Sequence, residues 1–65
     1  MPKTPIEVIR MALGREKDAV RDYTEYAKTA EEPSIREMFL FLAEEEKKHV
    51  KLLQDEVEKE IYQEM

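Results

Sequence analysis

The chain has 65 residues, a formal net charge of −5 and 42% charged residues, which bounds it to one small domain. The acidic balance argues against binding to nucleic acid or to an anionic membrane through bulk electrostatics. No cysteine is present, so disulfides, thiolate zinc sites and iron–sulfur clusters are excluded. A core of this size rarely stabilises a fold alone. We therefore expect a partner chain, a metal held by Glu and His, or both.

The first helix is predicted over about residues 5–30. Thr4 can serve as its N-cap, Pro5 suits the first helical position, and Glu7 completes a capping box. Apolar side chains follow at three- and four-residue spacing, which predicts one buried stripe. The stripe comprises Ile6, Ile9, Leu13, Val20, Tyr23, Ala27 and Ala30. Glu16 interrupts it near the middle.

A turn is predicted at about residues 31–33, and a second helix over about residues 34–64. Two starts are open: Pro33 as the first helical residue, or Ser34 as N-cap with Glu37 in a capping box. The apolar stripe comprises Ile35, Phe39, Leu42, Leu53, Val57 and Ile61. Glu46 and the only histidine, His49, interrupt this stripe.

Two helices joined by a short turn predict an all-α fold, an antiparallel two-helix hairpin. Apolar side chains cover more than one face of the second helix, so a lone hairpin would leave much apolar surface in water. We expect a homodimer of hairpins that forms a four-helix bundle. No apolar run approaches the roughly 18 residues of a membrane span, and no signal peptide precedes the first helix. The sequence thus predicts a cytoplasmic protein without a membrane partner.

Glu46 and His49 lie about one turn apart on one helical face, where both can reach one ion. This spacing alone is a weak signal, because 13 of the 65 residues are glutamate. With the turn centred near Glu31, Glu16 and Glu46 are each 15 residues from it and lie at the same height. Buried carboxylates are costly and repel one another. A two-fold axis would gather four glutamates and two histidines, and two divalent ions would supply the missing positive charge.

Structural explanations for the same residues remain open. Glu16 could pair with a lysine or arginine at the bundle edge, and His49 could be a core histidine bonded to a carbonyl. Glu45 is the reserve metal ligand if the second helix is rotated. Tyr23 is either an aromatic core residue or a hydrogen-bond donor or radical site beside the metals. Gly14 either permits a close helix approach or is tolerated at a cost of about 1 kcal/mol relative to alanine.

The segments "EKDAVRDYTEYA" (16–27) and "LAEEEKKHVKLL" (42–53) resemble the two metal-binding helices of rubrerythrins, in the ferritin-like di-iron carboxylate superfamily. Glu16 and Glu46 are expected to face each other in a hairpin of only two helices. This arrangement is similar to that of encapsulated ferritins, which are short hairpins whose metal site forms at a subunit interface. The resemblance covers about residues 6–57. It implies a ferritin-like bundle with iron ligands at Glu16, Glu46 and His49 and two irons per dimer. Manganese or zinc would also suit these donors.

The resemblance implies oxidation of Fe(II) by oxygen or peroxide, of the ferroxidase type, in iron handling or oxidative-stress protection. One alternative is a rubrerythrin-like protein that reduces peroxide with external electron donors, and another is a non-catalytic helical dimerisation module. A full rubrerythrin carries four helices in one chain and a cysteine-rich rubredoxin domain, so no attached electron-transfer partner is expected here. The resemblance also suggests a higher oligomer and an encapsulin shell as partners, with a location inside that nanocompartment. No shell-addressing tail is visible.

Overall fold

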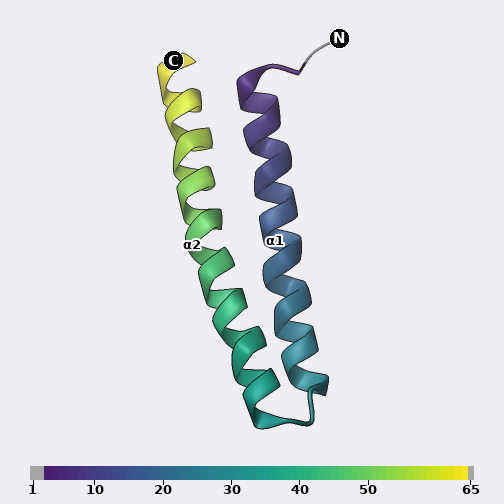
Figure 1. Cartoon of the computed structure of the whole chain (residues 1–65). Coiled ribbons are helices and arrows are strands. Elements are labelled where there is room, and N and C mark those ends of the chain that lie inside the picture. Colours follow the sequence, from purple (N-terminus) through teal and green to yellow (C-terminus); the bar gives the residue numbers. More distant parts are fainter. Residues whose placement is uncertain (1–2, 65) are drawn as a thin grey trace.

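The protein is a helical hairpin in a computed structural model that describes residues 3–64, and their side chains up to residue 59. Helix α1 spans Pro5–Thr29 and helix α2 spans Pro33–Glu64. The two run antiparallel, side by side, with the turn at one end and both termini at the other (Figure 1). The predicted all-α hairpin is confirmed. The side chain of Ile61, in the predicted stripe, lies outside the described set.

The start of α1 has the N-cap and the proline that its sequence predicts. Thr4 is extended, and its Oγ1 accepts a hydrogen bond from the backbone N–H of Glu7 at 3.3 Å. This bond satisfies one of the N–H groups that a helix leaves free at its first turn. Pro33 is the first residue of α2, which decides between the two predicted starts. Proline suits this position because the N–H that it lacks would have no helical partner there.

The turn between the helices is fixed by Arg36. Its Nη2 and Nε donate to the backbone carbonyl of Ala30 at 3.0 and 3.3 Å, and the N–H of Ala30 donates to the carbonyl of Tyr26 at 3.0 Å. These bonds satisfy groups that the end of α1 would otherwise leave free. A fixed turn also fixes the register of the two helices. Residues equally far from it are therefore held at the same height.

The contact between the helices is narrow. Among the described side chains, the hydrophobic residues that count as buried are Ala27 and Ala43, each 3% exposed. Between the levels of these two alanines, the ring of Phe39 packs on Tyr23 and Tyr26, with centroids 6.3 and 5.6 Å apart. The molecule measures 49 × 25 × 12 Å, and its smallest dimension is the diameter of one helix. The hairpin is thus a slab with two broad faces.

This slab leaves much apolar surface uncovered. Its accessible surface is 5373 Å², whereas a compact monomer of the same mass would expose about 4,400 Å². The excess, about 1,000 Å², exceeds the ~800 Å² that each partner buries in a standard interface. The exposed large apolar side chains include Val8, Met11, Tyr26, Ile35, Met38, Leu40, Phe41 and Leu52. Even so, neither helix in the described part is long and apolar enough to cross a membrane.

Gly14 lies inside α1 with open space around it. A Cβ atom at this position would meet no heavy atom within 4 Å, so no close helix approach inside the hairpin requires a glycine. Gly14→Ala is expected to raise the free energy of unfolding by about 1 kcal/mol, because alanine favours the helix. Denaturant unfolding at equal protein concentrations measures this change. A loss of stability would instead indicate that a second chain packs against this position.

Candidate metal centre

Three predicted ligands meet near the middle of the hairpin. Glu16 of α1 and Glu46 and His49 of α2 each offer one donor atom, and these atoms all lie within 4.8 Å of one another. His49 Nδ1 is 3.3 Å from Glu46 Oε2 and 3.6 Å from Glu16 Oε2. Donors bound at about 2.1 Å to one ion lie at most ~4.2 Å apart. Small side-chain rotations would therefore bring all three onto one ion.

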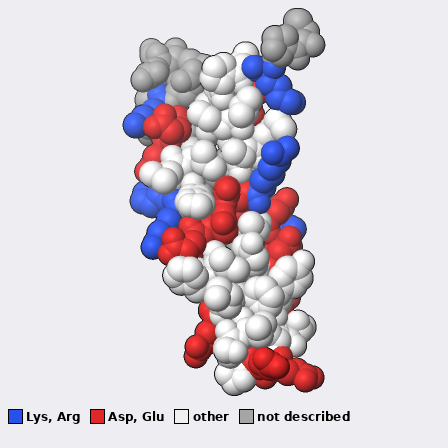
Figure 2. Space-filling model, viewed as in Figure 1, with Lys and Arg blue, Asp and Glu red and all other residues white. Residues whose placement is uncertain are grey.

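The local structure explains why these side chains converge. Glu46 and His49 are three residues apart, so consecutive turns of α2 present them on one side. Glu16 comes from α1 at the same distance from Glu31 as Glu46 does, and the register set by the turn puts the two carboxylates at one height. Figure 2 shows acidic surface gathered at mid-height of one broad face, between two largely uncharged stretches.

Glu16 is the least satisfied polar group of the site. Its Oε2 is buried and has no hydrogen-bond partner, although the side chain as a whole is 29% exposed. Among the described residues no lysine or arginine forms an ion pair with it, and its one ion-pair neighbour is His49. An unpaired buried acceptor costs about 1–3 kcal/mol, and more when it is charged. A cation bound at this oxygen would remove that cost, so the residues fit a metal.

His49 differs from the core histidine of the alternative explanation. Its side chain is 51% exposed, and its Nδ1 faces two carboxylates. The side chain of Glu46 is more buried, at 22% exposure. The group therefore opens toward the surface at His49, where a second protein chain or solvent can complete it.

The two further candidates, Glu45 and Tyr23, have other contacts. The Oε1 of Glu45 is 3.1 Å from Nζ of Lys48, and Glu45 does not join the three-residue group. Tyr23 stacks on Phe39, as expected of an aromatic core residue. Among the described residues, no Asp, Glu or His joins this group besides the three predicted ligands.

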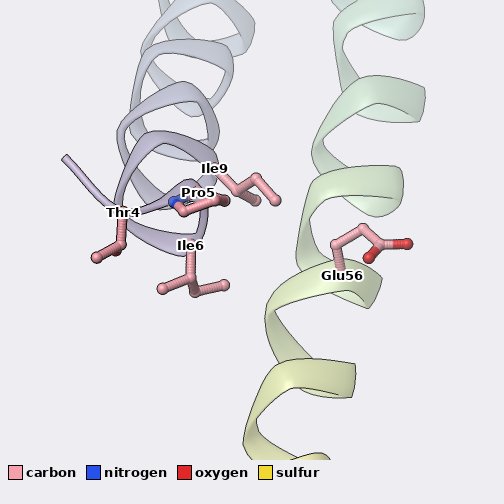
Figure 3. A pocket seen from close by; sticks show the side chains of 5 residues that line it. All are labelled: Thr4, Pro5, Ile6, Ile9 and Glu56. Carbon is pink, nitrogen blue, oxygen red and sulfur yellow. The ribbon is translucent and has the colours of Figure 1, made fainter. Parts of the chain in front are cut away.

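A separate hollow lies at the open end of the hairpin (Figure 3). It has a volume of about 480 Å³ and is lined by Thr4, Pro5, Ile6 and Ile9 at the start of α1 and by Glu56 of α2. The carboxylate of Glu56 pairs with Lys59 Nζ at 3.1 Å. With one carboxylate, already paired, and mainly apolar walls, this hollow lacks the donors of a metal site.

Comparison with known proteins assigns the chain to a family. The sequence model of the rubrerythrin family matches residues 7–65, and the chain belongs to this family of the ferritin-like di-iron superfamily. Rubrerythrin family members typically bind iron.

The chain is also similar to the encapsulin nanocompartment cargo protein EncB of Myxococcus xanthus (strain DK1622). The two are 43% identical over 42 residues, which cover 65% of this chain and 27% of EncB. The aligned segment thus spans about a quarter of that relative. No solved structure matches the chain.

Proposed function

We propose that the protein binds two iron ions at the interface of a homodimer and oxidises Fe(II) to Fe(III). The observation that carries this proposal is the group of Glu16, Glu46 and His49, with the Oε2 of Glu16 buried and without a hydrogen-bond partner. Membership of a family that typically binds iron supports the choice of metal. Manganese and zinc also suit carboxylate and imidazole donors.

A second copy completes the site in this proposal. One hairpin offers three ligand residues, and His49 is half exposed. Ferritin-like bundles hold two metals with one Glu from each of two helices and Glu-x-x-His from each of the other two. A two-fold axis beside the group gives that set from two identical hairpins. The four carboxylates would then balance the charge of two divalent ions. The excess accessible surface of the hairpin and its exposed large apolar side chains support the same partner.

The residues of the chain would favour oxidation by their charge. Carboxylates from Glu16 and Glu46 stabilise Fe(III) more than Fe(II), because the attraction grows with the charge of the ion. The buried oxygen of Glu16 would be drawn toward the ion as this charge rises. Two Fe(II) ions supply two electrons, enough to reduce dioxygen to hydrogen peroxide, or hydrogen peroxide to water, with protons from solvent.

Anaerobic titration of the metal-free protein with Fe(II) tests the proposal. Binding should saturate near one iron per chain, and subsequent oxygen should produce the absorbance of Fe(III). Rates with oxygen and with peroxide, measured by stopped flow, separate a ferroxidase from a peroxide-reducing protein. Binding without saturation, or a saturated protein that neither oxidant changes, would contradict the proposed activity.

We further propose that the protein resides in an encapsulin compartment, which would supply the space to store oxidised iron that a 65-residue chain lacks. The support is the cargo protein EncB as a relative. Because the similarity covers 27% of EncB, it does not identify the residues that would contact a shell. Co-expression with an encapsulin shell protein tests this part. Retention of the chain inside purified shells would support it, and purified empty shells would contradict it.

A further inference from the structure

A ridge of four residues on α2 points away from α1. It consists of Phe41, Glu45, Lys48 and Leu52, whose spacings of four, three and four residues place them along one side of the helix. Phe41 is 58% and Leu52 66% exposed, the two highest values among the large apolar side chains of the described residues. Ala43, on the opposite side of α2, is buried against α1. The hairpin itself therefore leaves Phe41, Lys48 and Leu52 exposed and covers Glu45 only in part.

The ridge is self-complementary about its midpoint, which lies between Glu46 and Lys47. Glu45 and Lys48 are each 1.5 residues from this point, and Phe41 and Leu52 are each 5.5 residues from it, or about 8 Å along the helix. In an isologous contact both chains use the same surface. If residue i of one chain contacts residue j of its partner, then residue j of the first chain contacts residue i of the partner. Antiparallel ridges related by a two-fold axis at the midpoint thus place Glu45 against Lys48, and Phe41 against Leu52, twice.

We propose that this ridge is a contact surface for the same ridge of a second copy, in this antiparallel register. Two arguments support the choice of occupant. The charges match only in one orientation, since a parallel pairing would place Glu45 against Glu45 and Lys48 against Lys48. The apolar residues flank the charged pair on both sides, so they would exclude water from the two ion pairs between chains. The ligands Glu16, Glu46 and His49 are not members of the ridge, so this contact adds to the one that closes the metal centre.

In a single chain, Glu45 already pairs with Lys48 at 3.1 Å, so the test must separate a bond within one chain from a bond between chains. The variants Glu45→Lys and Lys48→Glu do so. Each gives a ridge of one charge sign, which repels its own copies, and each should self-associate at least about tenfold more weakly than the wild type. An equimolar mixture brings ridges of opposite sign together. Sedimentation velocity and native mass spectrometry should then show recovered association, with mixed complexes above the statistical proportion.

A bond confined to one chain predicts the opposite result for the mixture, because each variant keeps its own like charges. The matched control is Glu25→Lys with Lys28→Glu, an exposed α1 pair with the same spacing and the same 3.1 Å separation. Mixing these two should change nothing. The proposal is overturned if mixing the ridge variants restores no association, or if the wild type does not self-associate. Circular dichroism verifies that each variant is helical. All measurements use metal-free protein, so they are independent of iron binding by the proposed centre.

Discussion

Replacement of Glu46 and His49 together by alanine is expected to abolish stoichiometric Fe(II) binding. These residues supply two of the three donors that each chain brings to the group within 4.8 Å. Loss of a residue that merely supports a metal ligand weakens binding about 10–100-fold, so loss of two ligands should exceed the upper value. Anaerobic titration followed by equilibrium dialysis measures the residual affinity.

The matched control for this variant is Glu44→Ala with Lys47→Ala. It removes one acidic and one basic side chain at the same three-residue spacing, and these two already pair with each other at 2.9 Å. Iron binding should be retained in the control. Saturation at one iron per chain in the Glu46 and His49 variant would show that other residues bind the metal.

Divalent metal is expected to raise the melting temperature of the protein strongly. A ligand bound only by the folded state adds ~2.7 kcal/mol at a concentration 100 times its Kd. For a chain of this size, each kcal/mol corresponds to roughly 4–8 °C, so the shift should be on the order of 10–20 °C. Mn(II) in air, or Fe(II) without oxygen, serves as the probe, with circular dichroism at 222 nm as the readout.

The same melting experiment distinguishes a metalloprotein from a helical module that only dimerises. Equal melting temperatures with and without metal would favour the module. The variant that lacks Glu46 and His49 should lose the shift, whereas the Glu44 and Lys47 control should retain it. Protein concentration must be matched across samples, because association itself stabilises a folded chain.

Much of the fold could be predicted because its signals are local. The Thr4–Pro5 cap and the spacing of apolar residues define α1, and the bond from Glu7 to Thr4 is present as expected. Helix α1 ends at Thr29, one residue before the predicted end, and α2 begins at Pro33, one of its two predicted starts. The convergence of Glu16, Glu46 and His49 followed from counting residues from the turn. This works because an antiparallel pair of helices leaves little freedom of register.

Other features could not be predicted because they depend on how the side chains pack in three dimensions. The bond from the Arg36 side chain to the carbonyl of Ala30, which holds the turn, has no sequence signature. The stripes predicted buried glutamates, yet the side chains of Glu16 and Glu46 remain 29% and 22% exposed. Two helices can bury only the narrow line along which they touch, so residues at the edges of a stripe stay half covered. The orphaned oxygen of Glu16 is likewise visible only when the neighbouring atoms are placed.

The 12 Å thickness of the hairpin has a consequence for how iron loading would be controlled. A slab one helix thick has no interior that could enclose an ion, so in the proposed dimer the neighbouring chain would supply the rest of the enclosure. Loading would then obey the law of mass action for two chains, and the number of complete sites would rise with the square of the free chain concentration. Dilution would release metal without any chemical trigger. Crowding of many copies in a small volume would keep the sites closed and full.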